Sequence, residues 1–352
     1  MNAPAHIPYL DGWRGLAIVC VLLGHFTGNL TGSPVIGWLG PFGVALFFAL
    51  SGRLMGELLF VRKVALTDFF VRRASRVIPT FWLFILAMAA ATLALPAWQV
   101  DGMELLSTLA FLRTYLSSGA SMLDNGWPIG HIWSLNVEEH TYVWLALCAW
   151  LARASGTSAR WTLLASCAVL LGVVLYYMVQ PPEGPTRWQM RTEAAALGIV
   201  AAAAIRCLPP LRSRLVLPLL CLACALSALC FSTYTHKSAQ LWFSPFCLGF
   251  AINYLDRLPA PALRMLAAPW LRWFGRCSFS LYLWQQPFFV AANQQSLPPA
   301  LALAGALGCG ALSFYLFEEP LRRYLNRAWA GRSRRPAHTD APPADAERSA
   351  QA

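Results

Sequence analysis

Residues 11–25 read Asp11-Gly-Trp-Arg14-Gly-Leu-Ala-Ile-Val-Cys-Val-Leu-Leu-Gly-His25, an apolar run with ionisable side chains toward both ends. The hydrocarbon core of a bilayer is about 30 Å thick and takes about 20 apolar residues of helix to cross. Extended to residues 13–30, this run predicts a first transmembrane helix. Positions 1–10 contain no Lys or Arg, so we expect no cleavable signal peptide and a helix that is retained.

Ten further apolar stretches follow the first. They lie at residues 36–60, 78–98, 103–118, 127–152, 161–180, 192–208, 214–232, 239–255, 270–292 and 299–318. The stretch at 103–118 is short and carries Glu104 and Arg113, which predicts an interfacial or re-entrant segment rather than a span. The sequence therefore predicts an all-α fold, a polytopic transmembrane bundle of about ten helices.

The composition indicates a membrane protein. Of 352 residues, 57% are hydrophobic and 12% are charged, and the mean hydropathy is +0.51. A soluble domain has about 25% charged residues. The charged residues are too few to cover the surface of this chain, so the apolar part of that surface is expected to face lipid. The 10 cysteines are scattered through apolar segments, which favours packing over metal or redox chemistry.

The net charge of +11 is unevenly distributed along the chain. If the N-terminus is cytoplasmic, 21 of the 27 Lys and Arg residues fall in cytoplasmic segments and 4 in outer ones. This bias predicts a multi-pass protein of the inner (plasma) membrane with both termini in the cytoplasm. Basic clusters between apolar runs, without a recognition motif, argue against nucleic-acid binding. We expect one transmembrane domain over residues 1–330 and a disordered cytoplasmic tail over 331–352.

Ionisable groups inside a bilayer are costly, and the first predicted helix carries several. Arg14 and His25 are eleven residues apart, so both lie on one helix face, about 16 Å apart along the axis. Asp11 is placed to pair with Arg14. A guanidinium near the inner surface suits a phosphate-bearing donor, and a deeper imidazole suits a proton acceptor. A structural histidine bonded to a neighbouring helix is the alternative.

A second polar segment reads His131-Ile-Trp133-Ser134-Leu-Asn-Val-Glu138-Glu139-His. Adjacent residues of a helix point about 100° apart. One glutamate is therefore expected to line the interior, and the other to pair with a neighbouring helix or a basic group. The spacing of the His and Glu residues does not match a zinc-protease motif, and we predict no metal site.

Three lesser features are also polar or basic. Ser51 and Gly52 lie within the second helix, where glycine permits close backbone approach. The basic stretch of residues 72–76 suits phosphates, although an ordinary positive-inside anchor explains it equally well. Residues 282–287 place the amides of Gln285 and Gln286 beside a proline kink. Two explanations fit these amides: a role at a functional site, or hydrogen bonding between helices.

In combination, these segments resemble the acyltransferase type 3 family of membrane O-acyltransferases, which includes O-antigen and polysaccharide O-acetylases. Six segments in order carry the resemblance: L-D-G-W-R-G-L with R-x10-H at 10–25, F-F-x-L-S-G at 47–52, R-x-x-R-x-x-P at 73–79, W-S-L-x-V-E-E at 133–139, F-S-L-Y-L-W at 279–284, and Glu319-Pro320. The chain departs from the family pattern at Arg53, Thr141 and Gln285, where an aromatic residue, Phe and His are usual.

The resemblance implies transfer of an acyl group from acyl-CoA, usually acetyl-CoA as co-substrate, to a hydroxyl of a saccharide in a surface or exported glycan. It implies no bound cofactor. It gives catalytic roles to Arg14, His25, Glu138 and Glu139. The matching residues expected to bind donor or acceptor are Asp11, Ser51, Gly52, Arg73, Arg76, Trp133, Ser134, Tyr282 and Trp284.

Two mechanisms fit these residues. His25 either removes the proton of the acceptor hydroxyl as it attacks the thioester, or is acylated first and hands the group across. Arg14 would hold a CoA phosphate or the thioester oxygen, and a glutamate would orient His25 or the acceptor hydroxyl. Two rivals come from other classes: a transporter or flippase for a glycan or acyl group, although no internal repeat is evident, and a non-catalytic scaffold.

Overall fold

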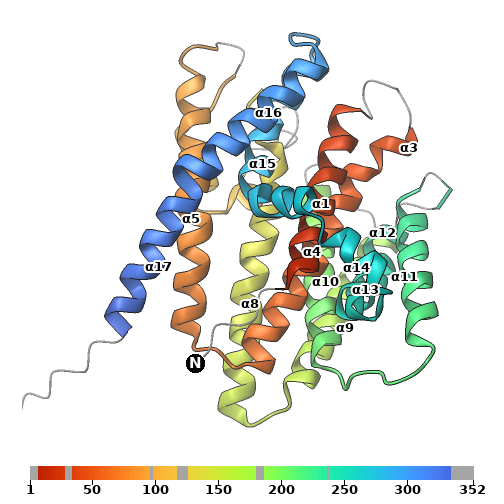
Figure 1. Cartoon of the computed structure of the whole chain (residues 1–352). Helices are drawn as coiled ribbons and strands as arrows, with labels where there is room; N and C mark the ends of the chain where they lie inside the picture. The colour runs from red at the N-terminus through yellow and green to blue at the C-terminus, as the bar shows by residue number, and fades with distance from the viewer. Residues whose placement is uncertain are drawn as a thin grey trace, which may run out of the picture.

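The computed structural model describes residues 7–27, 34–95, 98–116, 126–179, 186–232, 234–235 and 238–333, which form helices and no β-strand (Figure 1). The longer helices are α1 (Pro8–Phe26), α4 (Leu39–Met55), α5 (Leu66–Ala91), α8 (Trp133–Ser155), α9 (Ala159–Val179), α10 (Thr186–Cys207), α11 (Val216–Phe231), α15 (Pro269–Asn293), α16 (Pro299–Ser313) and α17 (Glu319–Ser333). The short helices are α3 (Pro34–Gly37), α6 (Gly102–Leu109), α7 (Arg113–Leu116), α12 (Ala239–Trp242), α13 (Ser244–Asn253) and α14 (Ala260–Leu266). Two π-helical segments, η1 (Gly56–Val61) and η4 (Phe314–Glu318), and two 3₁₀ turns, η2 (Gly130–Ile132) and η3 (Leu255–Arg257), complete the fold. The predicted all-α class is confirmed.

Four helices among the described residues are long and apolar enough to cross a membrane. They are Leu39–Val61, Leu66–Ala91, Ala159–Tyr176 and Pro299–Trp329. α1, α8 and α15 have 19, 23 and 25 residues but are not among these four, and each carries polar residues of the pocket described below. The polytopic helical class is therefore confirmed, and the number of ten spans stays a prediction.

Two of the predicted apolar stretches form broken rather than continuous helices. The described part of the predicted stretch 103–118, as far as Leu116, forms α6 and α7, which are too short to span a bilayer, in agreement with the re-entrant segment that the charges predict. Residues 239–255, predicted as one span, form α12 with four residues and α13 with ten. Pro245 stands in the first turn of α13, a position where the missing backbone N–H costs nothing.

The last apolar stretch is longer than predicted. α16, η4 and α17 follow one another without a break as far as Ser333. The tail predicted from residue 331 therefore overlaps a helix by three residues. Positions 334–352 lie outside the described residues, so their disorder stays a prediction.

The helix ends separate into two groups (Figure 1). The end of α1, the end of α5 and the turn between α15 and α16 lie at the upper end of the view, whereas the start of α5, the turn between α8 and α9 and the end of α17 lie at the lower end. The segments at the lower end include Arg62 and Lys63 before α5, Arg153 at the end of α8 and Arg332 at the end of α17. Which end faces the cytoplasm stays a prediction from the positive-inside bias.

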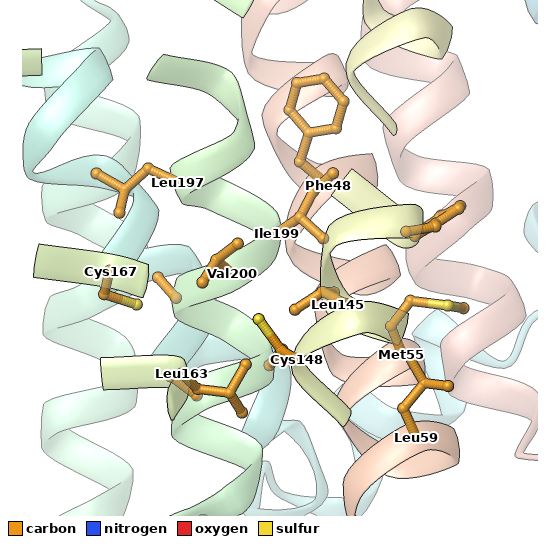
Figure 2. Packing of buried hydrophobic residues seen from close by; sticks show 14 of the residues in the cluster. Phe48, Met55, Leu59, Leu145, Cys148, Leu163, Cys167, Leu197, Ile199 and Val200 are labelled. Atoms are coloured by element: carbon orange, nitrogen blue, oxygen red, sulfur yellow. The ribbon is translucent and has the colours of Figure 1, made fainter. Parts of the chain in front are cut away.

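An apolar core joins four helices on one side of the bundle (Figure 2). It includes Phe48 and Met55 of α4, Leu59 of η1, Leu145 and Cys148 of α8, Leu163 and Cys167 of α9, and Leu197, Ile199 and Val200 of α10. In lipid such contacts stabilise by close packing rather than by the hydrophobic effect. The core fixes α8 relative to α4, and both helices bring polar residues to the pocket described below.

α1 crosses α15 at glycines. A Cβ added at Gly15 would overlap the carbonyl oxygen of Leu271, and one added at Gly275 would overlap the carbonyl oxygen of Asp11. Small residues allow this close approach between membrane helices. Arg14 lies between Asp11 and Gly15, so this crossing fixes its position relative to α15.

Candidate active site

A pocket of about 110 Å³ lies among α1, α4, α5, α8 and α15. We call it the arginine pocket, because Arg14 of α1 lines it together with Arg73 and Arg76 of α5. Its other polar lining residues are Ser51, Ser134, Glu138, Tyr142, Ser278 and Tyr282. Five of the motifs that are separated along the sequence therefore meet in one place.

Glu138 is the carboxylate that lines the arginine pocket. Ser51 and Tyr142 both donate hydrogen bonds to its Oε1, and Nη2 of Arg73 lies 3.5 Å from the same oxygen. Oε1 of Glu139 lies 2.8 Å from Nη2 and 2.9 Å from Nε of Arg73. The guanidinium carbon of Arg73 lies 4.2 Å from the ring centroid of Tyr142, which adds a cation–π contact. Arg73 is therefore an internal counter-ion for two carboxylates.

Arg14 and Arg76 leave positive charge in the pocket. Nη1 of Arg14 lies 3.4 Å from Oδ1 of Asp11, a loose pair between neighbouring turns of α1. Among the described residues, no carboxylate lies within 4.0 Å of Arg76. Glu318 interacts with Arg76 at longer range, and its buried carboxylate accepts a hydrogen bond from Ser280 at 2.6 Å. Cations without close partners in a desolvated site attract an anionic ligand.

His25 lies near the other end of α1 and lines a different cavity of about 440 Å³, which we call the histidine cavity. Its Nδ1 is 2.7 Å from Oε1 of Gln285, and its ring stacks on Phe289 with centroids 4.4 Å apart. Nε2 of Gln285 in turn donates to Oε1 of Gln286 at 3.3 Å. The hydrogen bond to Gln286 orients the side-chain oxygen of Gln285 toward His25. With Gln285 in this orientation, the matching tautomer has the proton on Nδ1 and the free lone pair on Nε2.

The two cavities have no described lining residue in common. Helix α15 passes both, because Tyr282, Gln285 and Phe289 share one of its faces. Tyr282 lines the arginine pocket, and its hydroxyl lies 2.6 Å from Oγ of Ser134 and 2.8 Å from the carbonyl oxygen of His131. One helix turn along α15, Gln285 holds the imidazole of the histidine cavity.

Several sequence-predicted residues line neither cavity. A Cβ at Gly52 would overlap the carbonyl oxygen of Ile199, so this glycine allows α4 to approach α10. Trp133 packs edge-on against Phe48, and Trp284 packs edge-on against Phe84. Glu139 pairs with Arg73, and Asp11 with Arg14. Direct contact of these residues with donor or acceptor stays a prediction.

Sequence reasoning missed the role of Tyr142, although its position four residues after Glu138 places both on one helix face. It also assigned Gln285 no role beside His25. The two residues are separated by 260 positions, and helix periodicity carries no information about that contact.

Three further buried polar side chains lie outside both cavities. His131 is 5% exposed and Asn136 is 0% exposed, and no hydrogen bond reaches their side-chain nitrogen and oxygen atoms within the described part of the chain. Arg113 is also fully buried and is held by Glu104 at 2.7 Å. In the sequence, His131 and Asn136 belong to the second polar segment, whereas Arg113 is conspicuous only through its charge.

The helical fold and the arginine pocket define a polytopic membrane protein with a pocket lined by three arginines. Comparison with known families narrows this class: the family model described as "Acyltransferase domain" matches residues 7–317. The chain belongs to this acyltransferase family. The matched region includes every described residue that lines the two cavities.

Curated relatives of the chain include bacterial O-acetyltransferases. The chain is 23% identical to the peptidoglycan O-acetyltransferase OatA of Listeria monocytogenes over 90% of its own length. It is 24% identical to the putative peptidoglycan O-acetyltransferase YrhL of Bacillus subtilis over 93%, and 28% identical to the O-acetyltransferase OatA of Staphylococcus aureus over 41%. The alignments cover 56% of the first two relatives, so the chain spans about half of their length. No solved structure matches the chain.

Proposed function

We propose that the chain is a membrane O-acyltransferase that moves an acetyl group from acetyl-CoA to a hydroxyl of a saccharide. The observation that carries the proposal is the arginine pocket, where Arg76 has no carboxylate within 4.0 Å among the described residues and Arg14 is paired only loosely, at 3.4 Å from Asp11. CoA is a polyanion, and arginine binds phosphate in a charge-assisted, bidentate manner. Membership of the acyltransferase family supports the same reading.

His25 is the group proposed to act on the acyl carbon or the acceptor. Because Gln285 holds the Nδ1 proton, Nε2 is free to accept a proton or to attack a carbonyl. Arg14 and His25 are about 16 Å apart along α1. A donor with its phosphates at the arginines and its extended arm along α1 and α15 would bring its thioester toward His25.

The reaction balances in either of two forms. In the direct form, Nε2 takes the hydroxyl proton, the oxygen attacks the thioester carbon, and the C–S bond breaks with CoA taking the proton. In the relay form, Nε2 attacks the thioester carbon, the C–S bond breaks, and CoA leaves as the thiolate while the acylated imidazolium keeps its Nδ1 proton. The acceptor oxygen then attacks the acyl carbon, the N–C bond breaks, and the hydroxyl proton is released to protonate the thiolate. The separation of the two cavities favours the relay form, in which donor and acceptor need not meet.

The basic residues support the proposed orientation. If their cytoplasmic placement is correct, the lower end of Figure 1 is cytoplasmic, the arginine pocket is reached by cytoplasmic acetyl-CoA, and the protein lies in the inner membrane. The names of the curated relatives make a cell-wall or exported glycan the proposed source of the acceptor.

A purified, full-length protein in lipid nanodiscs tests the proposal. Radiolabelled acetyl-CoA is supplied with a cell-envelope glycan fraction, and transferred acetate and released CoA are both measured. We expect His25→Ala to abolish transfer while the protein still inserts and elutes as a single species. His140→Ala is the matched control, because His140 lies on α8 outside both cavities and should leave transfer intact.

Retained acetyl transfer in His25→Ala would remove His25 from the mechanism. Movement of a glycan across the membrane without consumption of acetyl-CoA would favour a transporter instead. Mass spectrometry of glycans from a deletion strain and its parent should differ by one acetyl group per modified sugar.

A further inference from the structure

The histidine cavity is built from the ends of α1 and α15 and from the turn that leads into α16, at the upper end of the view in Figure 1. His25 and Phe289 form one side of it, and Asn293 and Gln295 come from the end of α15. At about 440 Å³, the cavity falls within the size range of small-molecule sites.

Charge distinguishes this cavity from the arginine pocket. None of its described lining residues is Asp, Glu, Lys or Arg, whereas three arginines line the other pocket. Its polar side chains besides His25 are the amides of Asn293 and Gln295, both exposed at the surface. Each amide group can both donate and accept hydrogen bonds. Phe289 and the start of α16 supply apolar walls. This combination matches a ring that has apolar faces and hydroxyl groups at its edge.

The turn that carries the amides is well defined. Gln295 has a left-handed backbone (φ 57°) that ends α15, and its N–H donates to the carbonyl of Ala292 at 3.1 Å. The N–H of Ser296 donates to Ala291 at 3.0 Å. Pro298 and Pro299 then begin α16 with fixed φ angles. The amides therefore stand on a closed turn, which reduces the entropy lost when they bind a ligand.

We propose that the histidine cavity is the acceptor site and that it selects an uncharged pyranose ring, with one hydroxyl at the His25 imidazole and others held by Asn293 and Gln295. The proposal rests on the proposed acetyl transfer and adds the site and class of the acceptor. A sugar carboxylate would lose water in this cavity without gaining a cation from the described lining residues, so uronic acids should be excluded.

Transfer to small soluble acceptors tests the proposal with the full-length protein in nanodiscs. The probes are methyl β-glucopyranoside, methyl N-acetyl-β-glucosaminide and methyl β-glucuronide, each with radiolabelled acetyl-CoA. We expect saturable transfer to at least one uncharged probe, with kcat/KM at least tenfold above that for the glucuronide. Asn293→Ala and Gln295→Gly should raise the acceptor KM at least fivefold while the KM for acetyl-CoA changes less than twofold. Glycine at 295 keeps the left-handed backbone.

A gain of function sharpens the test. Asn293→Lys places a cation in the cavity and should raise kcat/KM for the glucuronide at least fivefold. Gln294→Lys is the matched control, because residue 294 is exposed beside the cavity but does not line it, and its selectivity should be that of the wild type.

Three results would overturn the proposal: no transfer to either uncharged probe by a protein that acetylates its glycan fraction, equal or better use of the glucuronide by the wild type, or unchanged acceptor KM in both amide variants. Failure of the proposed function itself looks different, because the wild type would then consume no acetyl-CoA with the glycan fraction either.

Discussion

The arginine pocket and the histidine cavity lie along the same two helices, α1 and α15, yet they differ in charge and in burial. The first is buried among five helices, contains three arginines and holds a hydrogen-bonded carboxylate. The second lies at a helix end, has no described lining residue of fixed charge and is walled by aromatic and proline rings. This difference is the basis for proposing a polyanionic donor in the first and a neutral acceptor in the second.

The comparison also explains why the membrane helices with the most polar residues are the ones that meet at the site. Burying a guanidinium or carboxylate in a bilayer is costly unless it is paired. Arg73, Glu138 and Glu139 share the cost through mutual contacts, whereas His25 is uncharged when Gln285 holds its proton. Four predictions follow from this contrast, in order of decreasing effect.

Removing Arg73, the counter-ion of Glu138 and Glu139 at the arginine pocket, should have the largest effect. Arg73→Met leaves Glu138 and Glu139 without their shared cation, and loss of one partner of a buried pair costs about 3–5 kcal/mol. We expect a large fall in thermal stability in detergent and complete loss of acetyl transfer. Arg257→Met is the control, because Arg257 is 50% exposed and its partner lies 3.9 Å away. Equal stability of the two variants would show that the pocket does not depend on this network.

In the histidine cavity, loss of the hydrogen bond from His25 to Gln285 should have the second-largest effect. Gln285→Leu keeps a similar volume but leaves the Nδ1 proton without an acceptor, at a cost of about 1–3 kcal/mol. Since about 1.4 kcal/mol corresponds to tenfold in rate, kcat should fall by about 10- to 100-fold. The KM for acetyl-CoA should not change. Gln285→Glu restores an acceptor and should recover part of kcat, an outcome that a purely structural role would not produce.

Removing the least-paired cation should weaken donor binding without affecting the acceptor. Loss of one charge-assisted contact is worth about 1.5–3 kcal/mol, so Arg76→Gln should raise the KM for acetyl-CoA by about tenfold or more. Acetyl-pantetheine, which lacks the CoA phosphates, should be used equally by variant and wild type. A rise in the KM for acetyl-pantetheine of the same size would mean that Arg76 does not contact phosphate.

The smallest effect should come from filling the space beside His25 with one methyl group. A Cβ added at Gly40 would lie 3.4 Å from Cδ2 and 3.5 Å from Nε2 of the imidazole, which is ordinary contact. Gly40→Ala should therefore fold normally and lower kcat by about two- to fivefold, since small misplacements at a reacting atom reduce rate. Gly24→Ala, whose Cβ would overlap the backbone of Gly40, should destabilise the α1–α4 contact instead. An unchanged kcat in Gly40→Ala would show that Nε2 does not react on this side.

The sequence predicts the helical membrane class and the residue types of the arginine pocket well, because both depend on local patterns. Apolar length identifies spans, and an ionisable group within a span is conspicuous. The charges within 103–118 correctly predict that this segment does not span. The eleven-residue spacing of Arg14 and His25 places both on one face of α1.

Contacts between distant segments could not be predicted from periodicity. The face of α1 that carries Arg14 and His25 passes two cavities, because α4, α5, α8 and α15 line the one at Arg14, whereas the end of α15 and the start of α16 line the one at His25. Glycine 52 looks like a ligand-approach residue in the sequence, but its missing Cβ serves packing against α10. The pairing of His25 with Gln285 depends on the crossing of α1 and α15, which tertiary packing alone determines.

Sidedness of the reaction tests the central claim most directly. The full-length protein, with an affinity tag inserted at Gly156 in the exposed α8–α9 turn, is reconstituted in vesicles, and those with the tag outside are collected. Acetyl-CoA is added outside, and methyl β-glucopyranoside is trapped in the lumen. The account predicts acetylated glucoside in the lumen and no product when both substrates are confined to one side. Product formed only when both substrates share a side would contradict it.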